Sequence, residues 1–145
     1  MISKIQKNIL WFKEIIAKDV PLTGGKNASL GEMIRKLSKK RINIPDGFAL
    51  TASAYWYFLK ANGIDKKLKE LFKKFEPESL RSLRQTGKVA RRLILRGKFP
   101  PDLAKEIFRF YQKLSQKYDG EAIDVAVRSS ATAEDLPSAS FAGQH

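Results

Sequence analysis

Apolar side chains recur at helical spacing along much of the chain, and this pattern constrains the fold most. In one segment, Leu68, Leu71, Phe72 and Phe75 stand at i, i+3, i+4 and i+7. Similar stripes follow Lys26 and Thr51, run from near Pro77 towards Arg96, and continue beyond Pro101. Their apolar residues include Met33, Trp56, Phe58 and Phe108. Because such a stripe lets one face of a helix pack against a core, the sequence predicts a helix-rich fold whose aromatic stripes are core residues.

The sequence predicts fewer strands than helices, and the strands are shorter. Residues 8–12 and 48–51 are apolar and predict two strands, with a loop at residues 19–25 and with Thr51 as the N-cap of the next helix. A third strand is predicted from Ile123 to Arg128. Because successive side chains of a strand point to opposite faces, the isoleucine and valines would be buried. Arg128 would lie on the opposite face, at the end of the strand. The predicted fold class is therefore α+β, helix-rich with a small sheet.

Composition sets further limits on the class of protein. The chain has 145 residues, of which 43% are hydrophobic, enough for one domain with its own core. It has no cysteine, which excludes disulfides, thiolate metal sites and cysteine nucleophiles. No apolar run approaches the roughly 18 residues that span a membrane, and the first residues lack the apolar region of a signal peptide. We therefore expect a cytoplasmic protein that does not enter a membrane.

The net charge of +13 is concentrated in one part of the chain. Residues 60–119 hold 17 basic and 7 acidic side chains, so about +10 of the charge lies there. Such a charge is compatible with nucleic-acid binding, but the cations alternate with apolar residues over several helices and no nucleic-acid motif is present. The pattern favours a solvated basic face, or a surface that meets an acidic part of another polypeptide.

The first segment with chemical potential is Gly24–Met33, which contains two glycines, Lys26 and then a helix. Glycines let the backbone approach a ligand, and the first amides of a helix are unsatisfied and partly positive. A lysine at that point adds a full charge, so the group suits a phosphate. The Walker spacing is absent, and a glycine turn followed by an exposed lysine would look the same.

The second such segment begins at Arg128, at the end of the predicted strand. An arginine at a strand end, followed by small residues, is a common way to bind phosphate. Its hydroxyls could donate to phosphate oxygens, and its small residues would let a hairpin fold over a triphosphate. A polar loop that joins two strands is the alternative. The candidate ligand-binding residues here are Arg128, Ser129, Ser130, Thr132, Ser140, Gly143 and Gln144.

The two segments together resemble a known family. Gly24–Met33, Ile44–Phe48, Val125–Pro137 and Ala139–Gln144 occur in the order and spacing that is similar to the start of the phosphoenolpyruvate synthase (pyruvate, water dikinase) family. The resemblance begins near Leu10 and spans nearly the whole chain. Rifampicin phosphotransferases share much of both motifs, whereas pyruvate, phosphate dikinases depart from the Ser-Ser-Ala-Thr-Ala-Glu-Asp sequence that follows the arginine.

The resemblance implies a fold and a reaction. The matching part of the family is an ATP-grasp nucleotide-binding domain that binds ATP with Mg²⁺ between two lobes. The family transfers the β-phosphate of ATP through a phosphohistidine to pyruvate, giving phosphoenolpyruvate, AMP and phosphate. The family's phosphate-binding lysine and arginine correspond to Lys26 and Arg128, both assigned to catalysis and to ATP binding, and its small-residue loop corresponds to residues 129–144.

The resemblance also implies that residues 1–145 are part of a larger enzyme. The second ATP-grasp lobe, which would supply the magnesium ligands, is not within them, and neither are the phosphohistidine domain and the pyruvate-binding barrel. We therefore expect this segment to be inactive alone, with ATP and the remainder of a dikinase polypeptide, or a complementary chain, as its partners. Two alternatives stay open: a stand-alone phosphate or nucleotide binder, and a basic interaction module that has lost nucleotide binding.

Overall fold

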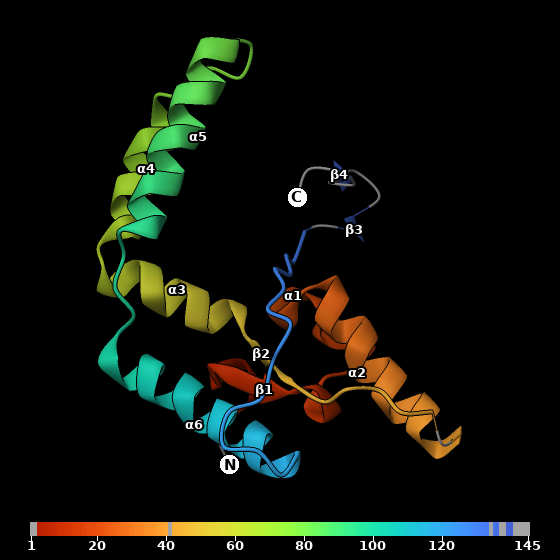
Figure 1. Ribbon diagram of the computed structural model, residues 1–145. Coiled ribbons are helices and arrows are strands. Elements are labelled where there is room, and N and C mark those ends of the chain that lie inside the picture. Colours follow the sequence, from red (N-terminus) through yellow and green to blue (C-terminus); the bar gives the residue numbers. More distant parts are fainter. Residues whose placement is uncertain (1–2, 41, 134, 137–138, 141–145) are drawn as a thin grey trace. The chain divides into compact units, whose positions relative to one another are not determined.

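The structure, a computed structural model, describes residues 3–40, 42–133, 135–136 and 139–140. The chain forms two compact units, one from Met1–Ala54 with Leu103–His145 and the other from Tyr55–Asp102. Helices make up most of the described residues, and the short strands pair in antiparallel sheets (Figure 1). The predicted class, α+β and helix-rich with a small sheet, is confirmed.

One sheet of the first unit is made by two of the strands that the sequence predicts. Strand β1 (Ile9–Trp11) pairs antiparallel with β2 (Phe48–Leu50), so that Leu10 stands opposite Ala49 and Trp11 opposite Phe48. Their apolar side chains explain the pairing, because each strand has a buried face to cover. The two strands place the segments before and after them on either side of one small core.

Helices cover both faces of this sheet. Successive residues of a strand point to opposite sides. On one side, Leu10 and Ala49 form the buried core with Ile15 and with Ala28 of helix α2 (Gly25–Leu37). On the other, Trp11 stacks on Phe110 of helix α6 (Pro101–Lys117) with ring centroids 4.9 Å apart. Figure 1 shows β1 and β2 between α2 and α6. The core therefore fixes the N-terminal half of α2, where the first motif lies.

Helix α2 uses small residues for its closest contact. Its buried residues are Ala28 and Gly31, whereas Met33, which the sequence pattern placed on the apolar face, is 40% exposed. A Cβ added to Gly31 would lie 2.4 Å from the carbonyl oxygen of Ile15. The apolar stripe therefore predicted the helix correctly, but the contact surface is centred on small residues that a hydrophobicity pattern does not single out.

The segment before α2 is more regular than predicted. In place of a loop at residues 19–25, the structure has the end of η3 (Ala17–Asp19), the one-turn helix α1 (Val20–Thr23) and the start of α2. Two further short turns, η1 (Lys4–Gln6) and η2 (Phe12–Glu14), lie earlier in the chain. The Asp19 carboxylate accepts a hydrogen bond from the Ile16 amide at 2.8 Å, which closes η3. Pro21 lies in the first turn of α1, where its missing N–H costs nothing. These local bonds stabilise the turns that lead to Gly24.

The second unit is mainly a pair of helices. Helix α3 (Ala52–Ala61) leads into it, and the Ala54 amide donates to Thr51 Oγ1 at 3.3 Å, which confirms the predicted N-cap. Helix α4 (Ile64–Lys73) packs against α5 (Leu80–Leu95). Helix α5 begins three residues after the predicted start near Pro77, because Ser79 caps it by accepting from the Ser82 amide at 3.2 Å. None of the helices in the described residues is both long and apolar enough to cross a membrane.

Several aromatic side chains that the stripes assigned to the core are exposed. Phe58 is buried, but Trp56, Phe72 and Phe108 are 54%, 54% and 59% exposed. The stripes therefore identified helices correctly and overestimated how much of each stripe is buried.

The predicted strand at residues 123–128 is absent from the described residues. The segment runs without regular structure, and Val125 and Val127, assigned to a buried face, are 48% and 92% exposed. A strand needs hydrogen-bonding neighbours, and no described element pairs with this one. Two very short strands follow, β3 (Asp135–Leu136) and β4 (Ala139–Ser140), paired antiparallel. The remaining short element is η4 (Ser38–Lys40), after α2.

Candidate functional site

The start of α2 is built as the first motif predicts. Gly24 precedes the helix with φ 81° and ψ 161°, a conformation that essentially requires glycine. The Ala28 amide donates to the Gly24 carbonyl at 3.1 Å, so the helix is continuous from its first turn. No acidic residue occupies that turn, and Lys26 is its second residue. The aligned amide dipoles of the helix and the ammonium group make this end of the helix positive.

The segment that follows Arg128 is bound directly to this helix start. Ser130 Oγ donates to the carbonyl oxygen of Thr23 at 3.0 Å. The same oxygen accepts from Asn27 Nδ2 at 2.7 Å, and Thr23 Oγ1 donates to the Asp19 carbonyl at 3.1 Å. Thr23 is only 3% exposed. A buried carbonyl thus joins α1, α2 and the second motif.

Gly24 permits this contact by having no side chain. A Cβ placed on it would lie 2.2 Å from Ser130 Oγ and 2.9 Å from the Ala131 carbonyl oxygen. Distances below 3.0 Å are not observed for real Cβ atoms. The glycine pair that suggested close approach to a ligand therefore also permits close approach of the chain to itself.

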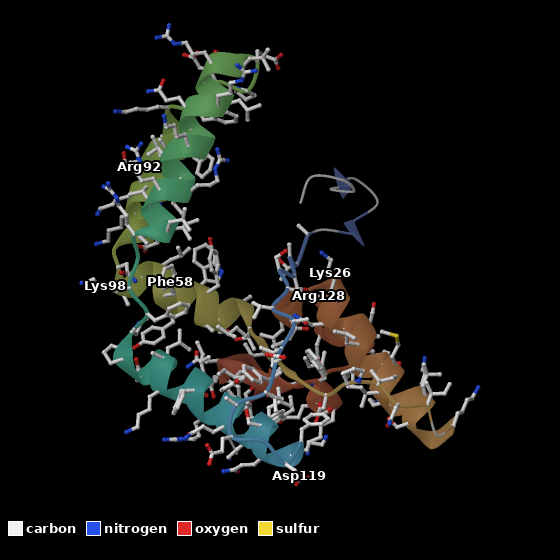
Figure 2. The ribbon with its side chains drawn as sticks, viewed as in Figure 1. Lys26, Phe58, Arg92, Lys98, Asp119 and Arg128 are labelled. Carbon is white, nitrogen blue, oxygen red and sulfur yellow. The ribbon has the colours of Figure 1, made fainter. Side chains whose placement is uncertain are left out.

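Lys26 and Arg128 lie near the contact between Gly24 and Ser130, and each is two residues from it along the chain. Lys26 lies two residues after Gly24, Arg128 lies two residues before Ser130, and both side chains are exposed. Since adjacent Cα atoms are about 3.8 Å apart, both residues are anchored close to one point. Figure 2 shows both side chains at the first turns of α2. The structure therefore brings the two predicted phosphate-binding cations to one end of one helix.

The other predicted site residues divide into three groups. Ser129 and Thr132 are exposed beside Arg128, and none of the three makes a hydrogen bond or ion pair within the described part of the chain. Ser130 is half-buried, with its hydroxyl on Thr23. Ser140 lies in β4, whereas Gly143 and Gln144 are outside the described residues.

Sequence reasoning missed the residues that hold the site together. Thr23 and Asn27 occur at i and i+4, a spacing that allows a side chain to reach a carbonyl one turn away. Glu32 is a second example, since it accepts from the Ala17 amide at 3.3 Å and ties α2 to η3. The Lys36 side chain, which bonds to Glu32, is the main cause of its lowered pKa, and the Ala17 amide adds to it. The i, i+4 spacing was visible in the sequence, whereas the Ala17 contact was not.

A separate hollow of about 550 Å³ lies at the opposite end of α2. Asp46 and Lys117 form an ion pair in its wall with a separation of 2.6 Å, and this hydrogen bond raises the pKa of Lys117. The Asp46 amide also donates to the Tyr118 hydroxyl at 2.9 Å. These charged groups already have partners, so this hollow is a poorer candidate for an anionic ligand than the start of α2.

The donor groups at the start of α2 suit phosphate rather than a metal ion. A lysine, an arginine, hydroxyls and helix amides all donate hydrogen bonds and favour negative charge. No group of three or more His, Cys, Asp or Glu residues that could hold a metal occurs in the part of the chain that the structure describes. The arrangement is able to bind and orient a polyphosphate, and a metal ion there would need ligands from beyond these residues.

Comparisons with known proteins agree with this chemistry. The family described as "Pyruvate phosphate dikinase, AMP/ATP-binding domain" matches residues 20–145. The phosphoenolpyruvate synthase of Aquifex aeolicus is 50% identical over 143 residues, which is 99% of this chain and 17% of that protein. The phosphoenolpyruvate synthases of Synechocystis sp. and Helicobacter pylori are 50% and 52% identical over 94% of this chain.

The match covers nearly all of the chain and a small part of each relative. The chain spans 17% of the length of these three relatives. The family match includes Lys26, Arg128 and the Gly24–Ser130 contact that joins their segments. On this evidence, the chain belongs to the family of pyruvate phosphate dikinase AMP/ATP-binding domains.

Proposed function

We propose that the start of α2 and residues 128–132 bind the phosphates of ATP. The observation that supports this most directly is the contact of Ser130 and Ala131 with Thr23 and Gly24, because it unites two motifs that are about a hundred residues apart. Neither motif alone is specific, since each has a structural alternative. Two cations anchored at one positive helix end are a group that a polyphosphate can bridge.

Each residue has a role that follows from its chemistry. Lys26 holds phosphate oxygens as a mobile point charge, and Arg128 binds two oxygens at once through its planar guanidinium. Ser129 and Thr132 donate hydroxyl hydrogen bonds beside it. Ser130 positions the segment through Thr23. In this proposal Ser140, Gly143 and Gln144 are further ATP-binding residues, of which Gly143 and Gln144 lie outside the described residues.

The proposal extends to the longer polypeptide in which such a segment works. Residues 1–145 would be the first part of an ATP-grasp-type domain, with the second lobe and its magnesium ligands in the rest of a dikinase polypeptide or in a complementary chain. That enzyme would be cytoplasmic and would make phosphoenolpyruvate, AMP and phosphate from ATP, pyruvate and water. Phosphoryl transfer depends mainly on positioning and charge neutralisation, which Lys26 and Arg128 would provide. The 145-residue chain alone would then be inactive.

The relatives favour this reading over a rifampicin phosphotransferase. The three relatives described above are phosphoenolpyruvate synthases, with identities of 50% to 52%. A stand-alone phosphate or nucleotide binder without catalysis is the second candidate, supported by the exposed cations of this chain.

Calorimetric titration of MgATP into the 145-residue chain tests the proposal. We expect weak binding that Lys26→Ala and Arg128→Ala each reduce by about tenfold to a hundredfold, the usual effect of losing a hydrogen bond to a charged group. Lys105→Ala and Arg109→Ala are matched controls, because both side chains are exposed on α6 and make no hydrogen bond or ion pair in the described residues. Equal losses in all four variants would mean that only bulk charge is measured. An absence of wild-type binding would contradict a half-site within this chain.

A further inference from the structure

Helix α5 has a solvent-exposed stripe of a defined pattern that the proposed ATP site does not use. Leu80, Arg84, Lys88, Arg91 and Leu95 stand at i, i+4, i+8, i+11 and i+15, so they follow one line along the helix. Leu80 is 72% and Leu95 83% exposed. Three cations therefore lie between two exposed leucines, over roughly 22 Å of helix. These five residues are called the α5 stripe below.

The cations of the α5 stripe have no partner among the described residues. Arg84, Lys88 and Arg91 are exposed and make no ion pair or hydrogen bond there. Arg81 and Arg92 lie beside the stripe and are also exposed, with no ion pair or hydrogen bond in the described residues. Residues 79–101 contain five arginines, two lysines and no acidic residue. Figure 2 shows nitrogen-tipped side chains projecting outward from the pair formed by α4 and α5. The positive charges of this face are therefore not paired with carboxylates of the described residues.

The surface next to the stripe is hollowed at the start of the helix. A shallow depression of about 460 Å³ is lined by Leu80, Arg81, Arg84, Gln85 and Lys88. It offers one apolar side chain beside three cations, which suits a partner side chain that is apolar next to a carboxylate. Further along, Gly87 leaves room for the Arg91 guanidinium, whose Nη1 lies 3.2 Å from where a Cβ would be.

We propose that the α5 stripe binds an acidic, amphipathic segment of a partner protein, with carboxylates between two apolar anchors about four helical turns apart. Carboxylates complement the three cations, and arginine in particular binds them through two hydrogen bonds. The two leucines complement apolar anchors, because covering them removes apolar surface from water. Arginine is enriched among the residues that dominate binding at protein interfaces.

Other occupants fit the stripe less well. A nucleic-acid backbone would use the cations and gain nothing from covering Leu80 and Leu95. A membrane surface requires apolar and basic residues on opposite faces, whereas here the cations lie between the leucines on one line. A second copy of the chain has a net charge of +13 and would bring like charges together.

Binding of a designed peptide tests the proposal. The probe is a capped helical peptide with leucine, three glutamates and leucine at the spacing of the α5 stripe; a control peptide has the glutamates on the opposite face. We expect Arg84→Gln/Lys88→Gln/Arg91→Gln to weaken binding roughly tenfold and Leu80→Ser/Leu95→Ser to do the same. Lys105→Gln/Arg109→Gln/Lys113→Gln removes three exposed cations from α6 and should change binding less than about twofold.

Several outcomes would overturn the proposal. Equal effects of the α5 and α6 variants, binding of both peptides alike, or no peptide binding would each exclude a specific docking face. Tighter binding of poly-uridine RNA or of phosphatidylserine vesicles, lost in the α5 variant, would assign the stripe to another occupant, and self-association lost in that variant would do so too. Binding to the 145-residue chain but not to a longer polypeptide that contains it would mean that the polypeptide itself covers the face. Circular dichroism confirms that each variant is folded.

Discussion

The two halves of the candidate site differ in how they are held. The half that contains Lys26 lies on a regular helix that packs on the core through Ala28 and Gly31. The half that contains Arg128 lies on a segment without regular structure, which meets the helix start through Ser130 and Ala131. One half is therefore part of a regular helix packed on the core, whereas the other is an irregular segment that meets the helix through a serine hydroxyl and a close backbone approach.

This difference indicates how a two-part phosphate site can be assembled. A helix end that is rigid before ligand arrives provides a fixed reference for the first cation. The second cation is on a segment without regular structure, which can adjust to a ligand or to a neighbouring strand. Substitutions that alter one half at a time separate these contributions, and Gly24, at which the two halves meet, has the largest expected effect.

Gly24→Ala should have the largest effect, because it disturbs both halves. Alanine is strained at φ 81° and ψ 161°, and its Cβ would collide with Ser130 Oγ at 2.2 Å. We expect a loss of about 3 kcal/mol in the free energy of unfolding, with residues 128–131 displaced from α2. Urea denaturation measures the first effect, and amide hydrogen exchange of residues 128–131 measures the second.

Gly63→Ala is the matched control for this change. Gly63 also has a positive φ, 62°, but nothing lies within 4 Å of the position of its Cβ. It should therefore lose only the cost of the backbone conformation, about 1 kcal/mol. Similar losses for the two variants would mean that the contact with Ser130 contributes nothing.

Gly31→Ala should disturb only the half that contains Lys26. Its Cβ would lie 2.4 Å from the Ile15 carbonyl oxygen, which is backbone and has little freedom to move. We expect a loss of about 2 kcal/mol, the usual scale of overpacking. Thermal unfolding followed by circular dichroism checks this value. Unchanged thermal stability would show that α2 is not held in place by this contact.

The sequence predicted the half that contains Lys26 better than the half that contains Arg128. Helix α2 and strands β1 and β2 follow from local patterns, and the structure places them as expected, whereas phosphate binding by Lys26 stays a prediction. The apolar stripe failed only in detail, because Gly31 and not Met33 makes the close contact. A pattern of hydrophobicity reports which side chains are apolar, whereas packing also depends on which residues are small enough for backbones to meet.

For the half that contains Arg128, the sequence suggested residue types that suit phosphate but predicted the wrong backbone structure. Alternation from Ile123 to Arg128 predicts a strand, but a strand forms only with a hydrogen-bonding neighbour, which no local pattern reveals. The same applies to Ser130, whose contact with Thr23 joins positions 107 residues apart. Long-range pairings of this kind were outside what residue spacing could predict.

Ser130→Ala should affect the half that contains Arg128 and leave the other intact. It removes the hydrogen bond to the Thr23 carbonyl, which keeps its bond from Asn27. We expect a local loss of about 1 kcal/mol, seen as roughly fivefold faster amide exchange at residues 128–131 with little change in the melting temperature. Asn27→Ala, by contrast, should lower the melting temperature. Ser130→Thr, which keeps the hydroxyl, should restore slow exchange, and failure of that rescue would count against the hydrogen bond.

The smallest effect is expected at Glu14, which lies next to the core residue Ile15 and so supports the half that contains Lys26. Burial alone would raise the pKa of Glu14, but hydrogen bonds from Lys7 Nζ at 2.8 Å and from the Trp11 amide at 2.9 Å outweigh it, so the pKa is lowered. A carboxyl group with a lowered folded pKa stabilises the protein above its unfolded pKa. That contribution is lost as pH falls through the lower, folded pKa.

Glu14→Gln should therefore cost about 0.5–1 kcal/mol at pH 7, the usual scale for an exposed ion pair combined with a cap. The difference from wild type should shrink as pH falls from the unfolded value of 4.5 through the folded pKa, because the wild-type carboxyl group is then neutral as well. Urea denaturation at a series of pH values measures this. A difference that stayed constant down to pH 2 would assign the effect to side-chain shape. Exchange at residues 128–131 should not change, since Glu14 lies next to Ile15 and so acts on the half that contains Lys26.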